Sequence, residues 1–176
     1  MNRHIRMATP ADAQAIHDLH TRSVRRLCAA DYPPEVIEEW LKGRSPEGYR
    51  GIAKNEMYVF ERDGKILGWS HVRPKCIVGL FVDAGHARQG VGRALFEHGL
   101  RIIREHTAEH LEFEATVTAA PFYEKCGCKR LSISTVRKND IDVPTVRMAY
   151  PEKSEPEVGQ VSSEAAPSAS PDEPST

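Results

Sequence analysis

The sequence predicts an α/β fold, in which the strands of a mixed sheet are covered by helices, and three observations support this prediction. The first is a strand, a glycine-containing turn and a helix in direct succession between Lys75 and Arg101. The second is an Asp63-Gly64 dipeptide between two strand-like runs, which is a strong signal for a β-hairpin. The third is a pair of helix start signals, near Thr9 and Pro34, upstream of the hairpin.

Length and composition indicate one domain of ordinary size followed by a polar tail. The chain has 176 residues, of which 40% are hydrophobic, and a formal net charge of −1. From Pro151 onward it is rich in Pro, Ser and Glu and carries a net charge of −5, so residues 1–150 carry +4. This excess suits an anionic ligand but is too small to indicate nucleic acid. We expect a single domain at 1–150 and a disordered acidic tail at 151–176.

The usual sequence signals for membranes, secretion and metals are not found. No apolar run approaches the ~20 residues that span a bilayer, and the N-terminus turns polar too early for a signal peptide. The four cysteines show no zinc-finger or thioredoxin spacing. We expect a cytoplasmic protein with reduced cysteines, a monomer or a homodimer, without a metal, a membrane or a nucleic-acid partner.

The first half of the chain reads as a strand, two helices and the hairpin. Arg3–Met7 is a short strand, after which Thr9 is a candidate N-cap and Pro10 suits the first position of a helix. His17 and His20 lie three apart in this helix, a pair more typical of a surface or a wall than of metal ligands. The following elements are a second helix and the two hairpin strands, at Pro34–Lys42, Met57–Arg62 and Lys65–Val72.

The stretch after residue 75 has the form of a phosphate-binding turn. Cys76–Val82 is apolar and rich in β-branched residues, which predicts a buried strand. The helix that follows begins near Gly90 and Gly92, and a helix start offers free N–H groups and the positive end of its dipole to a phosphate. Gly99 lies on the apolar face of this helix, where a bare backbone allows close packing. The dinucleotide fingerprint is excluded because Leu95 stands where its third glycine would be, and no P-loop run occurs.

The second half of the chain predicts three strands and a short helix. Leu111–Ala115 is a strand candidate, and a short helix then ends with Gly127 as its C′ residue. Lys129–Arg137 and Val143–Tyr150 are two further strands, joined around Asn139. Together with the earlier elements, they complete the sheet.

Two stretches resemble motifs of the GNAT superfamily of N-acetyltransferases. The strand LFV followed by ARQGVGRAL resembles the strand and pyrophosphate loop of motif A, Q/R-x-x-G-x-G/A, with Ala87 at the Q/R position and Arg88 and Gln89 supplying polar side chains. Residues 119–128 reproduce the pattern A-x-x-F-Y-E-K-x-G-F, with Cys128 in place of the final Phe. The resemblance covers roughly residues 3–150 and rests on both motifs in the correct order and spacing.

The resemblance implies a fold, a donor and a coenzyme site. The implied fold is a mixed central sheet of about six to seven strands, splayed near its middle, with about four helices. The implied chemistry is direct attack of a neutral amine, on a small molecule or exposed on a protein, on the thioester of acetyl-CoA, with no metal. The pantetheine arm would pair with the strand and the pyrophosphate would bind the turn. The implied coenzyme contacts are Leu80, Phe81, Val82, Arg88, Gln89, Gly90, Val91, Gly92, Arg93 and Ala94.

The resemblance also assigns a general acid and leaves the base open. Tyr123 of the F-Y-E-K run would protonate the leaving thiolate, with a structural packing tyrosine as the alternative. The strand CIVGLFV has no carboxylate, so the candidates for the base are His71, Glu112 and Glu114. Our hypothesis is that His71 or Glu114 relays the proton through water.

The acceptor and the rival functions stay open at the level of sequence. In the resembled family, the segment after the first strand walls the acceptor site, so Tyr32, Trp40 and Tyr49 are candidate substrate contacts, with core packing favoured for Trp40. A cysteine nucleophile is disfavoured because no His/Asp arrangement accompanies it. The alternatives to an acetyltransferase are a non-catalytic module that binds an acyl-CoA and an interaction protein recruited through its acidic tail.

Overall fold

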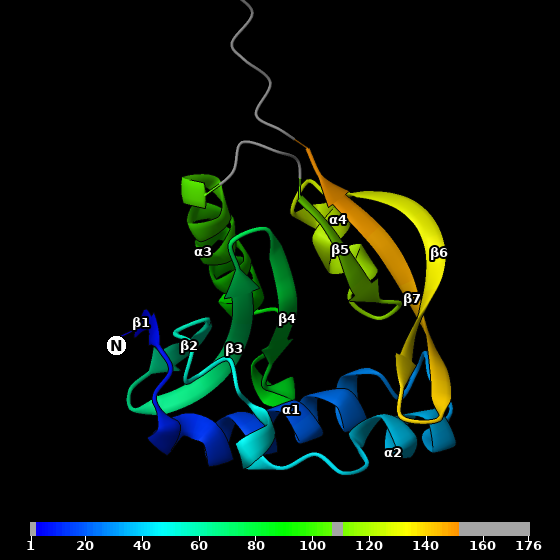
Figure 1. Ribbon diagram of the computed structural model, residues 1–176, viewed down its shortest axis with the longest axis horizontal. Helices are drawn as coiled ribbons and strands as arrows, with labels where there is room; N and C mark the ends of the chain where they lie inside the picture. Colours follow the sequence, from blue (N-terminus) through cyan, green and yellow to red (C-terminus); the bar gives the residue numbers. More distant parts are fainter. Residues whose placement is uncertain (1–2, 107–110, 152–176) are drawn as a thin grey trace, which may run out of the picture.

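The computed structural model describes residues 3–106 and 111–151, and its elements follow the predicted order (Figure 1). The strands are β1 (Arg3–Met7), β2 (Met57–Arg62), β3 (Lys65–Arg73), β4 (Cys76–Val82), β5 (Leu111–Thr116), β6 (Lys129–Lys138) and β7 (Ile141–Tyr150). The helices are α1 (Ala13–Leu27), α2 (Pro34–Leu41), α3 (Val91–His106) and α4 (Ala120–Lys125), and single 3-10 turns occupy Pro10–Asp12, Pro46–Gly48 and Ala84–His86. The predicted tail lies outside the described residues from residue 152 onward.

The strands form two antiparallel sheets that meet at a splay. The first sheet has the order β1-β2-β3-β4, and the second has the order β5-β7-β6. The edge strands β4 and β5 lie beside each other without a hydrogen-bonded ladder between them (Figure 1). The predicted α/β fold with a splayed sheet is therefore confirmed, and the splay leaves one long edge of β4 unpaired.

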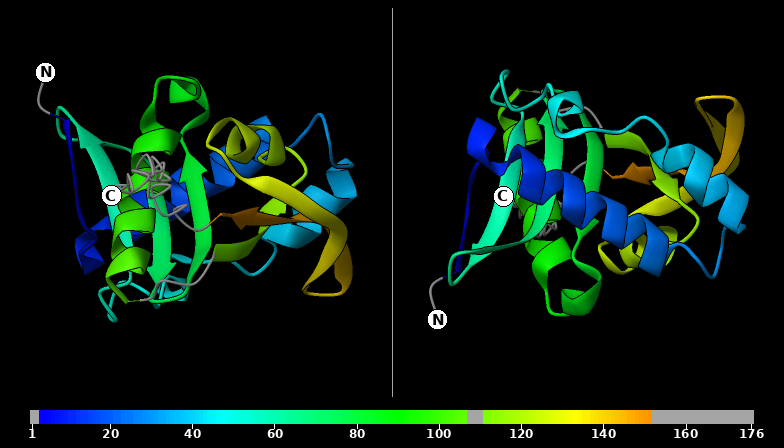
Figure 2. Two further views of the ribbon diagram at one scale, coloured as in Figure 1. Left: turned by 90° about the horizontal axis from the view of Figure 1, so that it is seen from above. Right: turned by 90° about the horizontal axis from the view of Figure 1, so that it is seen from below.

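Helices α1 and α3 cover opposite faces of the first sheet. Trp69 of β3 packs among Ile16 and Leu19 of α1, whereas Leu67 packs against Val91 and Leu95 of α3. A β-bulge in β3, opposite Phe60 and Glu61 of β2, interrupts the alternation of side chains along the strand. Leu67 and Trp69 therefore point to opposite faces of the sheet although they are two positions apart. Figure 2 shows α3 in front of the sheet from above and α1 in front of it from below.

Gly99 of α3 allows the close packing that the sequence predicts. A Cβ at this position would lie 3.2 Å from Cγ2 of Val72 and 3.3 Å from Cδ1 of Ile77. A side chain here would push α3 away from β3 and β4. Among the described residues, no helix is both long and apolar enough to cross a membrane.

The prediction that Cys76–Val82 is a buried strand is correct for the strand and wrong for the burial. Only Ile77 is buried in β4, and Val78 is 48% exposed. The physical reason is that β4 is the last strand of its sheet, so one edge faces the splay and not another strand. Apolar composition alone does not distinguish a central strand from one that borders a ligand site.

Asp12 holds the start of α1 through a network of short hydrogen bonds. The guanidinium of Arg6 donates to both carboxylate oxygens of Asp12, at 2.8 and 2.9 Å. The backbone N–H of Thr9 also donates to this carboxylate, at 2.7 Å. The hydrogen bond from Arg6 is the main reason that the pKa of Asp12 falls from 3.8 to about 2.

Asp12→Asn is expected to reduce the free energy of unfolding by up to about 2 kcal/mol at pH 7. The folded pKa of Asp12 lies below its unfolded value, so the stabilisation is complete above about pH 5 and disappears as the pH falls toward about 2. Urea unfolding of the wild type and the variant at pH 7 and pH 3 measures this. The exposed pair of Arg137 with Asp142 provides the control, Asp142→Asn, which should cost less than about 0.5 kcal/mol. An equal loss at both pH values for Asp12→Asn would contradict the prediction.

Candidate active site

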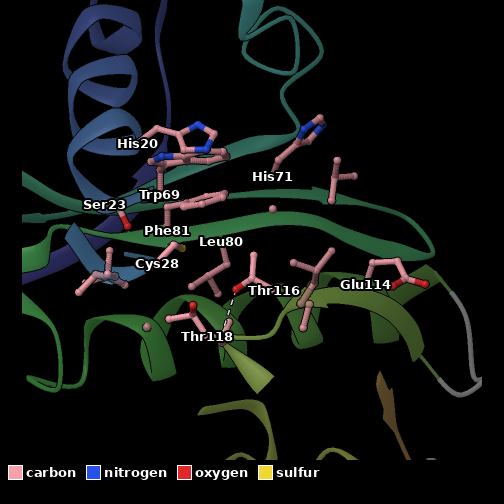
Figure 3. A pocket seen from close by; sticks show the side chains of 18 of the residues that line it. His20, Ser23, Cys28, Trp69, His71, Leu80, Phe81, Glu114, Thr116 and Thr118 are labelled. Atoms are coloured by element: carbon pink, nitrogen blue, oxygen red, sulfur yellow. Dashed lines mark hydrogen bonds between the residues drawn. The ribbon is translucent and has the colours of Figure 1, made fainter. Parts of the chain in front are cut away.

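A cavity of about 1440 Å³ occupies the splay between the two sheets. Residues of β4 and β5 line its middle, the turn before α3 lines one end, and the segment after α2 lines the other. Figure 3 shows the rings of Trp69 and Phe81 stacked beneath His20, with Leu80 near Thr116 of β5 and Thr118 of the turn that follows β5. The cavity therefore passes along the free edge of β4 and connects the two covered faces of the first sheet.

The turn before α3 borders the cavity with Gly90, Gly92 and Arg93. Gly90 has a φ of +84°, which glycine adopts without strain, and α3 begins at the next residue. The N–H of Ala94 donates to the carbonyl of Gly90 at 3.0 Å, which is the first hydrogen bond of the helix. The N–H groups of Val91, Gly92 and Arg93 precede this bond and have no acceptor within the helix. This end of the cavity fits the phosphate groups of a coenzyme.

Gly92 lies where α3 approaches β4 and α4. A Cβ on Gly92 would lie 3.4 Å from Cγ2 of Val82 and 3.4 Å from Cε2 of Phe122. A small side chain is therefore just accommodated, and a longer one must turn toward the cavity. The glycine keeps the helix start open to a phosphate.

The structure divides the predicted coenzyme contacts into two groups. Those that line the cavity are Leu80, Phe81, Val82, Arg88, Gly90, Gly92 and Arg93. The other three do not present their side chains to it. Gln89 accepts a hydrogen bond from Arg62 at 3.1 Å, and Val91 is buried in the core. The N–H of Ala94 already donates to the carbonyl of Gly90.

Tyr123 lines the cavity from α4 and is enclosed by aromatic rings. Its ring packs edge-on against Phe96, Phe113 and Phe122, with centroid distances of 5.3, 4.7 and 4.9 Å. Burial raises the pKa of Tyr123 well above the ordinary value of a phenol, so the hydroxyl remains protonated at neutral pH. A protonated phenol beside the cavity is able to donate a proton to a leaving thiolate.

His71 is accompanied by a carboxylate that sequence reasoning missed. Its Nε2 lies 3.0 Å from Oε2 of Glu56, and both residues line the cavity. The hydrogen bond with His71 is the main reason that the pKa of Glu56 is lowered, so this carboxylate stays ionised. The signal was present in the hairpin, because Met57 pairs with His71 across β2 and β3, and Glu56 directly precedes Met57.

The two glutamates of β5 differ in position. Glu114 lines the cavity and accepts a hydrogen bond from Oγ1 of Thr145 at 2.8 Å. Glu112 pairs with Arg147 of β7 and does not line the cavity. Glu114 therefore remains a candidate base, whereas Glu112 forms its ion pair outside the cavity.

The predicted acceptor contacts include one that the structure contradicts. Tyr32 does not line the cavity. Its hydroxyl donates to the carbonyl of Pro144 at 2.6 Å and accepts from the N–H of Val117 at 2.8 Å, so it ties the α1–α2 connection to the second sheet. Trp40 is buried against Tyr32 and borders the cavity, and Tyr49 lines it with its hydroxyl 3.0 Å from Nδ1 of His20.

Comparisons with known proteins agree with this geometry. Residues 28–150 match the family model described as an acetyltransferase (GNAT) domain. The uncharacterized N-acetyltransferase YafP of Escherichia coli is 27% identical over 126 residues, which cover 72% of this chain and 81% of that protein.

Solved structures share the fold at lower identity. A GCN5-related N-acetyltransferase from Rhodopseudomonas palustris superposes with a TM-score of 0.73 at 22% identity, covering 85% of this chain and 95% of that one. The PaiA N-acetyltransferase of Thermoplasma acidophilum superposes with a TM-score of 0.69 at 18% identity, covering 85% and 98%. YncA of Salmonella typhimurium superposes with a TM-score of 0.63 at 16% identity, covering 90% and 99%. The solved structures show the fold, and the match of residues 28–150 to the family model shows that the protein belongs to the GNAT family of acetyltransferases.

Proposed function

We propose that this protein transfers the acetyl group of acetyl-CoA to a primary amine by direct attack of the neutral amine on the thioester. The observation that carries the proposal is the single cavity that joins the free N–H groups of α3, the unpaired edge of β4 and the hydroxyl-bearing ring of Tyr123. The Thermoplasma structure is a complex with coenzyme A and the Salmonella structure holds acetyl-CoA, which supports the choice of donor.

Different segments of the cavity wall bind different parts of acetyl-CoA. The N–H groups of Val91, Gly92 and Arg93 bind the pyrophosphate, with the positive end of the α3 dipole adding attraction. The open edge of β4, at Leu80–Val82, offers backbone groups to the amide groups of the pantetheine arm, as a further strand would. These contacts hold the donor in one orientation, which lowers the entropic part of the barrier.

The reaction moves two protons, one away from the amine and one to the leaving sulfur. Acetyl-CoA supplies an acyl group activated as a thioester. The new N–C bond forms as the C–S bond breaks, so the amine must lose a proton and the sulfur must gain one. Tyr123 gives its proton to the sulfur, and the pair of His71 with Glu56 accepts the amine proton through water. Glu56 keeps the imidazole oriented toward the cavity and stabilises it once it is charged.

His71→Ala is expected to lower kcat about tenfold or more and to change the acidic limb of the pH–rate profile. Glu56→Gln should lower kcat by a smaller factor, because it removes the charge that supports the imidazole and keeps a hydrogen-bonding group. Measurements of kcat for both variants between pH 5 and pH 9 test this prediction. Glu114→Gln is the comparison that decides between the two candidate bases. A normal profile for His71→Ala together with an altered one for Glu114→Gln would assign the proton to Glu114.

Two measurements test the function itself. Calorimetric titration with acetyl-CoA should show binding in the micromolar range, and release of coenzyme A thiol should depend on an added amine. The absence of binding by the folded protein would overturn the proposal. Binding without amine-dependent thiol release, across a broad panel of amines, would instead favour a non-catalytic module that binds an acyl-CoA.

A further inference from the structure

The end of the cavity opposite the α3 turn brings two cations together from distant parts of the chain. Arg44 follows α2, and its Nε donates to the carbonyl of Trp40 at 3.2 Å, which anchors the side chain. Lys138 stands at the tip of the β6–β7 hairpin. Nδ2 of Asn139 fixes this tip against α2 by donating to the carbonyl of Glu39 at 2.7 Å (Figure 1). Both cations line the cavity.

Neither cation has an acidic partner within the part of the chain that the structure describes. Arg44 and Lys138 are half-buried, and no carboxylate forms an ion pair with either of them. The acidic side chains that line the cavity are Glu56, paired with His71, and Glu114, bonded to Thr145. The positive charge at this end is therefore uncompensated.

The effect of this charge is visible on neighbouring groups. Burial, and then the positive charge of Arg44, lower the pKa of Lys138. Burial, followed by Arg44 and Lys138, lowers the pKa of His20 to about 2. His20 is thus neutral, and its buried Nε2 has no hydrogen-bond partner among residues 3–106 and 111–151. Two like charges in a half-buried site cost free energy, and a bound anion would relieve that cost.

The position of the pair separates it from the phosphate end of the cavity. Arg88 and Arg93 belong to the α3 side, where Arg93 donates to the carbonyl of Lys125 at 3.2 Å. The pair of Arg44 and Lys138 lies instead beside the wall formed by His20, Tyr49, Trp69 and Phe81. In this wall the rings of Trp69 and Phe81 stack with a centroid distance of 5.1 Å (Figure 3). An apolar wall next to two cations suits a ligand with a short carbon skeleton and one anionic group.

We infer that the acceptor is a small amine bearing a carboxylate, and that Arg44 and Lys138 bind this carboxylate at the α2 end of the cavity, an inference that rests on the proposed acetyl transfer. A guanidinium binds a carboxylate through two parallel hydrogen bonds, and Arg44, which is anchored through its Nε and also hydrogen-bonds with the side chain of Tyr49, lines this end of the cavity. Lys138 adds a second charge from the other sheet. The amino group then faces the middle of the cavity.

The test compares each acid with its own carboxamide. The probes are the free L-amino acids, β-alanine and 4-aminobutyrate, each beside the corresponding amide, which removes the negative charge and keeps the amine. Binding to the protein saturated with coenzyme A is measured by calorimetry, and kcat/KM for acetylation is measured in parallel. We expect at least one acid to be preferred over its amide by about tenfold or more. The amine of the amide loses its proton more easily, so this preference cannot arise from the amine.

Substitutions of Lys138 and Arg44 test whether these two cations cause the preference for an acid over its amide. Lys138→Gln should reduce it about tenfold, because the substitution removes one of the two positive charges and keeps a polar side chain. Arg44→Gln should reduce it as well. Lys54→Gln is the matched control, because Lys54 also lines the cavity but is exposed, and it should leave the preference unchanged.

Three outcomes would overturn the inference. The first is equal binding of acids and amides by the wild type, and the second is an effect of Lys54→Gln equal to that of Lys138→Gln. The third outcome is that the Arg44 and Lys138 variants weaken coenzyme A but not dephospho-coenzyme A, which would assign the cations to the 3′-phosphate of the coenzyme. Binding of acids that depends on Lys138, without any acetylated product, would support the carboxylate site and refute the proposed transfer.

Discussion

Tyr123→Phe is expected to lower kcat about 100-fold or more and to leave the Kd for acetyl-CoA within about twofold of the wild type. The substitution removes one hydroxyl and keeps the ring that packs against Phe96, Phe113 and Phe122. The core should therefore remain intact while the leaving sulfur loses its proton donor. Steady-state kinetics with a saturating amine, together with calorimetry of the coenzyme, separate these two effects.

The raised pKa of Tyr123 adds a condition to this prediction. Because burial favours the neutral phenol, the donor is protonated over the whole neutral and alkaline range below about pH 10. The wild type should consequently show no loss of kcat from this group as the pH rises from 7 to 9. Tyr150→Phe is the matched control, since Tyr150 packs edge-on against Phe96 at a centroid distance of 5.8 Å but does not line the cavity. Equal losses in the two variants would make Tyr123 a packing residue.

Gly92→Glu is expected to weaken acetyl-CoA binding at least about 100-fold, or about 3 kcal/mol. The new side chain begins 3.4 Å from Val82 and Phe122, so it has to extend into the cavity. There its carboxylate lies at the start of α3, accepts hydrogen bonds from the free N–H groups and repels the coenzyme phosphates. Calorimetric titration measures the loss directly.

Gly92→Gln and Gly92→Ala separate charge from size. Glutamine has nearly the same volume without the charge and should weaken binding less than glutamate does. Alanine meets only ordinary van der Waals contacts and should bind close to normally. Thermal unfolding confirms that each variant is folded. Normal acetyl-CoA affinity in folded Gly92→Glu would show that the coenzyme does not bind at this turn.

Elements with local signals could be predicted from the residues alone. The Asp63-Gly64 turn connects β2 and β3 as predicted, and Asn139 and Gly127 have the positive φ values that turns and helix ends require. The succession of β4, glycine turn and α3 was predicted for the same reason, since each step depends on neighbours within a few residues. Two spaced motifs then sufficed to identify the family, which the comparisons confirm.

The tertiary structure alone decided which side chains meet across the splay. Tyr32 was expected at the acceptor site, but its hydroxyl binds Pro144, which lies 112 positions further along the chain. Glu56 lies within hydrogen-bonding distance of His71 only because the hairpin register places it there. Arg44 and Lys138 converge because a hairpin tip of the second sheet docks on α2 of the first half. Local patterns define strands and helices, but the contacts that build this cavity depend on how two sheets diverge, and that angle is set by the packing of the whole core.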